Sequence, residues 1–495
     1  PTSVPAPVPL ERISPVPLEP APKRSKATKI VAISLAALVI GGGALAATPL
    51  GAFGYYAITD AVRAKDYERM LQATIEQSRR AMATDTNSQA DASLGAQDAT
   101  ISKAPRFAPL SAYAAFSSFL REVRFGSDPA IHAHATTLLG QATKNAKDAQ
   151  YLALARAAEA AALGQVAKAK QAVAGLARRG ANDIDIAVLE GEVDLMAGEA
   201  KPALEAWDRG SKLEKSPRIA FGKARAYYAL DDIKSAETEA RRAIEASAEH
   251  VGARILLAKI LLKTDQEEKA VAVLDEILKN PKIRQSAGRS ELVSLHTLVG
   301  QVHLVRSRMS LSEAAFAEAL KLDPKDGDAL CGFGEVLYRE GRYAEALARY
   351  EAGIQANPES VDAKVGAAKT KIALERLQEA KDLLRKLRET RPADATVAYW
   401  LAQAEDALGN KADVEKILTD ALARNPTGTE AIRIYVALSQ FLAAQGRTQD
   451  AEARLNEARK KLPDVPAIHK ALGDVALAAG RFPEAKSEFQ IALQK

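Results

Sequence analysis

Histidine and cysteine are the residues best suited to hold a metal ion or to act in catalysis, and this chain has few of them. It contains six histidines and one cysteine in 495 residues. His296 and His303 are seven residues apart, which places them on one face of a helix, whereas His132 and His134 point well away from each other. A zinc site needs three or four ligands grouped at short spacings, and no such group occurs in the sequence. We therefore expect neither a metal site nor a cofactor.

Nucleophilic catalysis has no better support. Cys331 lacks a convincing histidine partner, so we expect an unreactive thiol, and a single cysteine cannot form a disulfide within the chain. The sequence has neither a GxSxG nucleophile elbow nor a phosphate-binding GxxxxGK[ST] loop. Its carboxylates are scattered over solvent-facing helix positions. The sequence predicts a protein that is not an enzyme.

The overall composition indicates closely packed helices. Aromatic residues make up only 5% of the chain while apolar residues reach 47%, mostly Ala and Leu, and Ala is the best helix former. The 68 Lys and Arg residues against 63 Asp and Glu give a net charge of +5, a small excess at this length. A nucleic-acid partner requires basic residues concentrated on one face, so we expect none.

The elements that position these residues follow from a recurring pattern, which is clearest in residues 327–360. Positions 4, 7, 8 and 11 of this segment form one apolar stripe on a first helix. A glycine then turns the chain, small residues allow the helices to approach, and a proline ends the second helix. The residues of the pattern are Leu330, Phe333, Gly334, Leu337, Gly341, Tyr343, Ala346, Tyr350 and Pro358.

This pattern resembles the tetratricopeptide repeat, a 34-residue antiparallel helix pair. It recurs in near-register in ten units, and residues 285–292 look like an insertion that disturbs the register. The resemblance implies an all-α fold, a right-handed superhelical solenoid of about ten helix-turn-helix repeats over residues 150–495, with a concave groove. The units are 150–183, 184–217, 217–250, 251–284, 293–326, 327–360, 361–394, 395–428, 432–465 and 466–495.

The same resemblance implies which residues line the groove, because tetratricopeptide repeats usually present positions 2, 5, 9, 12 and 13 of each first helix. The stretch 218–263 is basic and partly aromatic, which suits an acidic or aromatic-bearing peptide through charge and cation–π contacts. An ordinary solvated face would use the same residue types. The predicted partner-binding residues are Arg218, Phe221, Arg225, Tyr228, Lys259, Lys263, Tyr338, Arg339, Lys369 and Tyr399.

The N-terminal part of the chain has a different character. Residues 1–29 are rich in proline and then in lysine and arginine, which indicates a stiff polyproline-II-like linker or a docking site for a proline-recognising cytoplasmic partner. Residues 30–58 carry no charge and are long enough to cross a lipid bilayer. Because basic residues precede this segment, the positive-inside rule predicts one transmembrane helix with the arm in the cytoplasm.

Two further segments connect this anchor to the solenoid. Within residues 59–104 we expect a juxtamembrane helix over 60–83, followed by a flexible linker over 84–100, where Ala, Ser, Asp, Gln and Thr leave little to bury. Residues 105–149 carry two helical patterns, which predict a helical cap or a degenerate repeat.

Together these features predict a membrane-anchored scaffold that binds proteins or peptides in its groove. Residue usage rich in Ala and Arg looks like that of a high-GC bacterium. By fold-level analogy we expect an envelope machine of the pilus, secretion or gliding-motility type, in the inner membrane with the array in the periplasm. Two alternatives stay open: an organelle import receptor with a cytosolic array, and the substrate-gripping part of an enzyme whose catalytic domain lies outside this sequence.

Overall fold

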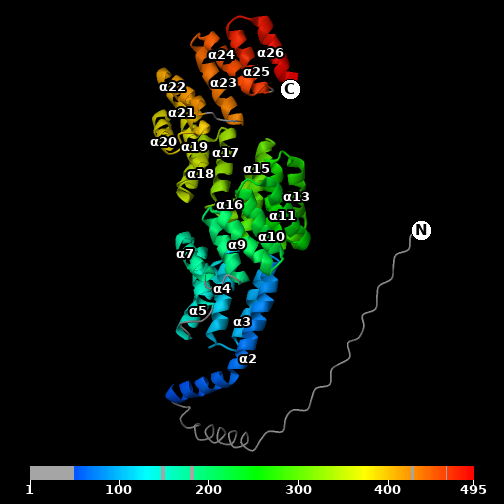
Figure 1. Cartoon of the computed structure of the whole chain (residues 1–495). Helices are drawn as coiled ribbons and strands as arrows, with labels where there is room; N and C mark the ends of the chain where they lie inside the picture. Colours follow the sequence, from blue (N-terminus) through cyan, green and yellow to red (C-terminus); the bar gives the residue numbers. More distant parts are fainter. Residues whose placement is uncertain (1–48, 146–150, 179–182, 425–427, 464, 495) are drawn as a thin grey trace, which may run out of the picture. The chain divides into compact units, whose positions relative to one another are not determined.

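The computed structural model describes residues 49–145, 151–178, 183–424, 428–463 and 465–494. Over these residues every regular element is an α-helix, from α2 to α26 (Figure 1). The all-α fold predicted from the sequence is therefore confirmed. The chain divides into two compact units, residues 1–73 and 74–495.

The first unit contains the predicted arm and membrane helix. Residues 1–29, and residues 30–58 apart from the last ten, lie outside the described residues. The described part of the first unit belongs to α2 (Pro49–Ala83), which includes the helix predicted over 60–83. Among the helices that the structure describes, none combines the length and the apolar character needed to cross a membrane.

Residues 84–100 are not the flexible linker that their composition predicts. They form most of α3 (Asn87–Ile101), which buries the polar side chains of Ser93 and Gln97 together with Ala90 and Ile101. Gln97 Nε2 donates a hydrogen bond to Ser78 Oγ at 2.9 Å, and Ser93 Oγ lies 3.1 Å from the same oxygen. The linker prediction was wrong because buried polar groups that are hydrogen-bonded can replace an apolar stripe.

The predicted cap region contains α4 (Ala108–Phe125) and α5 (Pro129–Asn145), which pack against each other and against the helix that follows. Fifteen of the 18 residues of α4 are buried. A terminal cap would present a polar outer face, whereas a helix buried on all sides is a core element. α4 is therefore a central helix of the second unit, and it also contacts α3, α8 and α15.

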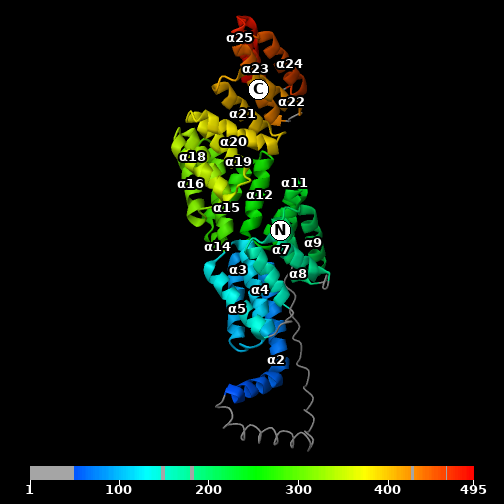
Figure 2. The same ribbon diagram turned by 90° about the vertical axis from the view of Figure 1, so that its left-hand side faces the viewer.

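The rest of the described chain forms ten successive helix pairs, which match the ten predicted units (Figures 1 and 2). One short helix, α14 (Pro281–Gln285), stands between the fourth pair and the fifth. The pairs are α6 (Leu152–Ala162) with α7 (Val166–Ala177), α8 (Ile184–Met196) with α9 (Ala200–Leu213), α10 (Pro217–Ala229) with α11 (Ile233–Ala246), α12 (Val251–Lys263) with α13 (Glu267–Lys279), α15 (Arg289–Val305) with α16 (Met309–Leu322), α17 (Gly327–Arg339) with α18 (Tyr343–Ala356), α19 (Val361–Ala373) with α20 (Leu377–Thr390), α21 (Ala395–Ala407) with α22 (Lys411–Ala423), α23 (Gly428–Ala444) with α24 (Thr448–Lys461), and α25 (Pro466–Ala478) with α26 (Phe482–Gln494).

Aromatic side chains of the second helices are held between glycines of the first helices. A Cβ added at Gly334 would lie 3.0 Å from the ring of Tyr350, and one added at Gly366 would lie 2.1 Å from it. Trp207 is enclosed in the same way by Gly191 and Gly222. The small residue that the pattern requires near the middle of each first helix thus makes room for an aromatic ring, as close packing demands.

The turns within the pairs place one residue in the left-handed region. In the pair α17–α18 this residue is Gly341, with φ 76°, which glycine adopts without strain. Four other turns hold a residue with a side chain in that region: Asp231, Asp265, Ser307 and Glu375, with φ between 54° and 62°.

Candidate functional site

The first helices of successive pairs contact one another from α8 to α25, and the surface that they form is here called the inner face. Two cavities lie on this face among the described residues. The upstream cavity, of about 220 Å³, is lined by Arg124, Phe221, Arg225, Gly252, Ile255, Leu256, Lys259, Ser290, Glu291 and Ser294. The downstream cavity, of about 570 Å³, is lined by Gln301, Leu304, Asp328, Cys331, Gly332, Glu335, Tyr350, Asp362, Val365, Gly366, Lys369, Thr396, Tyr399, Trp400 and Arg433.

The upstream cavity is partly filled by the C-terminal end of α4. The guanidinium of Arg124 lies 4.6 Å from the ring centre of Phe221, a cation–π contact. It forms ion pairs with Asp85 at 2.8 Å and with Glu291 at 3.0 Å, and its side chain is 10% exposed. The chain thus places its own arginine on an aromatic ring of the inner face, between two carboxylates.

Asp85 is the centre of this buried cluster. His250 Nε2 lies 3.2 Å from its carboxylate, and the histidine side chain is fully buried. Burial opposes the ionisation of Asp85, but Arg124 and His250 more than offset it and hold the pKa of that carboxyl well below its usual range. Removing one member of such a cluster leaves an uncompensated charge in the interior.

The predicted insertion at 285–292 is where this cluster meets the array. The N–H of Asn87 donates to the carbonyl of Ser286 at 2.9 Å. A Cβ added at Gly288 would lie 2.5 Å from Cβ of Phe125, so only glycine permits this approach. The insertion therefore has a structural role, because the segments that precede the array pack against it.

The predicted basic strip at 218–263 is not a continuous open surface. Arg218 and Phe221 are buried, at 5% and 6% exposure, so neither offers a side chain to a partner. Arg225 forms an ion pair at 2.8 Å with Glu192 of the preceding repeat. The expectation that these three residues line a free groove differs from the structure because Arg218 and Phe221 are buried and Arg225 is paired with the preceding repeat.

The remaining residues of the strip are more accessible. Lys263 is exposed, forms an ion pair with Asp231 and lies 5.5 Å from the ring centre of Tyr228. Lys259 is half-buried and lines the upstream cavity.

Of the other four predicted residues, Lys369 and Tyr399 line the downstream cavity, whereas Tyr338 and Arg339 contact its lining residues Lys369 and Glu335. The ammonium of Lys369 pairs with this carboxylate and lies 4.3 Å from the ring centre of Tyr338. Arg339 Nε donates to Glu335 at 2.8 Å, and the hydroxyl of Tyr350 donates to it at 3.1 Å. Burial opposes the ionisation of Glu335, but Lys369 and Arg339 lower its pKa overall. Glu335 therefore has both Lys369 and Arg339 as counter-ions.

Sequence reasoning missed several residues that line this cavity. The ring centres of Tyr399, which was predicted, and Trp400, which was not, are 5.1 Å apart and nearly perpendicular. Asp328, Asp362 and Arg433 stand at position 2 of their repeats, which the family pattern includes, so the same reasoning could have found them. Trp400 stands at position 6, outside that pattern, and no signal in the sequence marks it.

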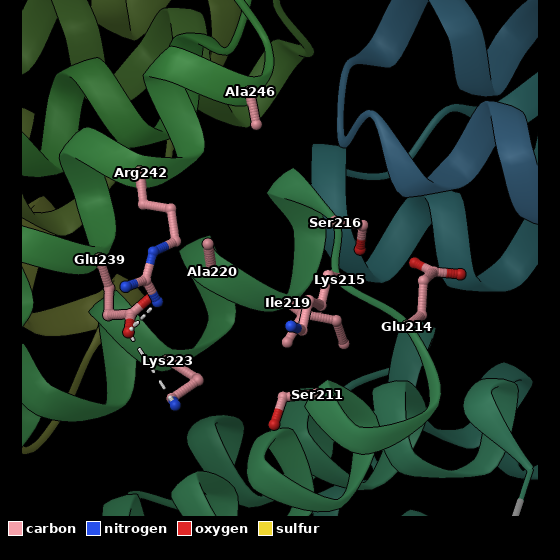
Figure 3. Close-up of a pocket in the computed structure, with 10 residues that line it drawn as sticks. All are labelled: Ser211, Glu214, Lys215, Ser216, Ile219, Ala220, Lys223, Glu239, Arg242 and Ala246. Carbon is pink, nitrogen blue, oxygen red and sulfur yellow. Dashed lines mark hydrogen bonds and ion pairs between the residues drawn. The ribbon is translucent and has the colours of Figure 1, made fainter.

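A third cavity, of about 470 Å³, lies beside α9, α10 and α11 and involves second helices (Figure 3). Figure 3 shows that Lys223 and Arg242 both reach toward Glu239. The distances are 3.9 Å and 2.8 Å, and Lys223 also pairs with Asp208 at 2.9 Å. These cations are already neutralised within the fold, so this cavity is a weaker candidate.

The histidines have separate surroundings. His132 pairs with Glu122 and His134 with Asp98, each at 2.8 Å. Burial lowers the pKa of His296 and of His303, which favours neutral rings at their inward-packing positions. Within the described ranges, no group of three or more His, Cys, Asp or Glu residues is placed to hold a metal ion.

Comparison with known proteins supports the repeat pattern. Tetratricopeptide-repeat family models match residues 337–399 in one case, and 221–287, 298–361 and 436–495 in another. Cellulose synthase 1 operon protein C of Komagataeibacter xylinus is 26% identical over 194 residues, 37% of this chain and 14% of that protein. Anaphase-promoting complex subunit 7 of Mus musculus is 27% identical over 179 residues, 36% of this chain and 31% of that protein. The chain thus spans less than a third of each of these relatives.

Two solved structures are similar to the array. A human IFIT1 dimer with m7Gppp-AAAA is 13% identical, with a TM-score of 0.49 and coverage of 86% of this chain and 99% of that one. PilW, a type IV pilus biogenesis factor, is 15% identical, with a TM-score of 0.38 and coverage of 45% of this chain and 98% of that one.

Proposed function

We propose that this tetratricopeptide-repeat protein is a scaffold that binds other proteins in the downstream cavity of its inner face. The observation that carries the proposal is the contrast between the two cavities: α4 enters the upstream one, whereas the downstream one is larger and its lining comes from the repeats alone. Half-buried aromatic and basic side chains line the downstream cavity, and such residues supply much of the binding energy at protein interfaces.

We further propose that the scaffold serves a bacterial envelope machine, of the pilus, secretion or gliding-motility type. In this proposal residues 30–58 anchor the chain in the inner membrane, the arm 1–29 engages a cytoplasmic partner, and the array binds periplasmic partners. Support comes from the uncharged stretch after four basic residues, read by the positive-inside rule. A matching bacterial relative is named for a cellulose synthase operon.

Site-specific photo-crosslinking tests the binding role. A photoreactive amino acid replaces Tyr399 in the downstream cavity or, as a control, the exposed Lys386 on the second helix α20. We expect discrete protein adducts from position 399 and none of the same size from position 386. Equal labelling from both positions, or no adduct from 399 in cells that express the chain, would contradict the proposal.

A topology reporter tests the membrane arrangement separately. Alkaline phosphatase fused after Lys495 is active only if the C-terminus lies outside the cytoplasm. Green fluorescent protein fused at the same place fluoresces only if the C-terminus stays in the cytoplasm, because it does not fluoresce after Sec-dependent export. An active phosphatase supports the periplasmic array. A fluorescent fusion would instead support the import-receptor alternative, with the array in the cytosol.

A further inference from the structure

The downstream cavity carries unmatched charges of opposite sign at its two ends. Asp328 of α17 and Asp362 of α19 occupy the same position in successive repeats, and both are exposed. Neither carboxylate has a hydrogen bond or ion pair with another described side chain. Arg433 of α23 occupies that position two repeats further on.

The thiol of Cys331 lies in the same cavity as the two aspartates, and its pKa responds to their charge. Burial raises its pKa to about 11, and the nearby carboxylates of Asp362 and Asp328 add to this effect. Both aspartates line the same cavity as Cys331, so their carboxylates disfavour a thiolate there and favour a cation.

The opposite end already holds a cation. Arg433 lies 5.7 Å from the ring centre of Tyr399 and donates a hydrogen bond to Thr396 Oγ1 at 3.3 Å. Lys369 of α19 and Arg339 of α17 already pair with Glu335, on the same helices that carry the two aspartates. A second cation is thus disfavoured beside Arg433 and favoured beside the two aspartates.

The upstream cavity already binds an arginine side chain of the same chain. There, Arg124 is enclosed by the carboxylates of Asp85 and Glu291 and by an aromatic ring. The downstream cavity has two carboxylates of its own but no arginine from the chain between them.

We propose that the downstream cavity recognises a lysine or arginine side chain of the partner protein, seated between Asp328 and Asp362. The partner segment then runs past Val365 toward Tyr399 and Trp400, where the rings supply apolar contact. This inference rests on the proposed function, because it specifies the chemistry of the bound segment. Charge complementarity of this kind selects among partners and speeds association.

Cys331, the only cysteine, allows a direct test in the full chain. Its modification rate is measured with a cationic and an anionic methanethiosulfonate reagent. We expect the cationic reagent to react faster, because the potential of the two aspartates acts within one Debye length of about 8 Å. The ratio of the two rates should fall severalfold in an Asp328→Asn/Asp362→Asn variant.

A control double variant, Glu268→Gln/Glu389→Gln, removes the same charge at exposed positions outside the cavity and should keep the wild-type ratio. A ratio near one in the wild type, or the same fall in both double variants, would overturn the inference. Circular dichroism of each variant establishes that the helices are retained.

Peptide protection tests the ligand itself. Three acetylated pentapeptides that differ only at the central residue, arginine, citrulline or glutamate, are compared as protectants of Cys331. We expect the arginine peptide to slow modification at concentrations roughly tenfold below those of citrulline, the difference that one charge-assisted hydrogen bond makes. Equal protection by arginine and citrulline would refute recognition of a cation.

The outcomes separate this inference from the function on which it rests. If position 399 still crosslinks to a protein in the Asp328→Asn/Asp362→Asn variant, at an unchanged yield, then the scaffold proposal stands and the basic-residue inference fails. If the arginine peptide protects but no protein is captured at all, then the cavity chemistry stands and the scaffold proposal fails.

Discussion

The two cavities of the inner face are built from the same helix positions but differ in what occupies them. Upstream, α4 brings Arg124 onto Phe221, and the buried carboxylates of Asp85 and Glu291 bind it. Downstream, Asp328 and Asp362 remain exposed beside a cavity of about 570 Å³. A repeat face thus becomes part of the core where another segment of the chain covers it, and stays available for a partner where none does.

Breaking the upstream cluster should have the largest effect. Replacing Arg124 with alanine leaves Asp85 and Glu291 buried without their cation, and such losses cost roughly 3–5 kcal/mol. The free energy of unfolding from urea titration measures it. Arg349→Ala, which removes an exposed cation–π contact to Phe333, is the control and should cost about 0.5–1 kcal/mol. Equal losses in the two variants would show that the cluster is not a structural centre.

Filling the space beneath an aromatic ring should have the next largest effect on the free energy of unfolding. This substitution can be made in the upstream and in the downstream repeats. Gly366→Ala downstream and Gly222→Ala upstream each place a Cβ within 2.4 Å of an aromatic ring. Overpacking of this kind costs roughly 1–3 kcal/mol. Gly327→Ala is the matched control, since nothing lies within 4 Å of its added Cβ. Wild-type stability in both ring-contacting variants would contradict the packing of the repeats.

Acid should weaken the upstream half through Asp85. The pKa of Asp85 is lower in the folded state than in the unfolded state, where it is about 3.9. The ionised carboxylate therefore contributes its full stabilisation above a pH of about 3.9, and this stabilisation is lost as the pH falls from there toward the folded-state pKa. Unfolding free energies between pH 6 and pH 3 should therefore fall more steeply in the wild type than in Asp85→Asn.

The comparison with Glu335→Gln extends this test to the downstream half. Glu335 also has a lowered pKa, so its contribution is lost in the same direction, below about 4.3. Parallel pH profiles for wild type and Asp85→Asn would show that the buried cluster does not depend on this charge.

The smallest effect concerns the turns, which the two halves share. Glu375 has φ 57°, a conformation that costs an ordinary residue roughly 1–2 kcal/mol and glycine little. Glycine also makes the unfolded chain more flexible, which offsets part of this gain. Glu375→Gly should therefore raise the thermal midpoint of unfolding by only about a degree or two. Asp265→Gly upstream should do the same. A lowered midpoint in both would mean that the side chains stabilise these turns by more than the strain costs.

The sequence by itself determined the helix pairs. The apolar stripe of each first helix, the small residues at its centre and the turn after it are local features, so a 34-residue period was enough to locate all ten pairs. It also placed Lys369 and Tyr399 on the surface that lines the downstream cavity, because the position of a side chain on its own helix is fixed by helical geometry.

Only the tertiary structure decided which part of that surface is open. Arg124 and Glu291 are 167 residues apart in the chain, and no periodicity relates them. Arg218 and Phe221 fit the groove pattern yet are buried, while residues 84–100 have the composition of a linker yet form most of a helix that packs through Ser93 and Gln97. Burial depends on which distant segments meet, and that follows from the sum of many weak contacts and not from the spacing of residues within one helix.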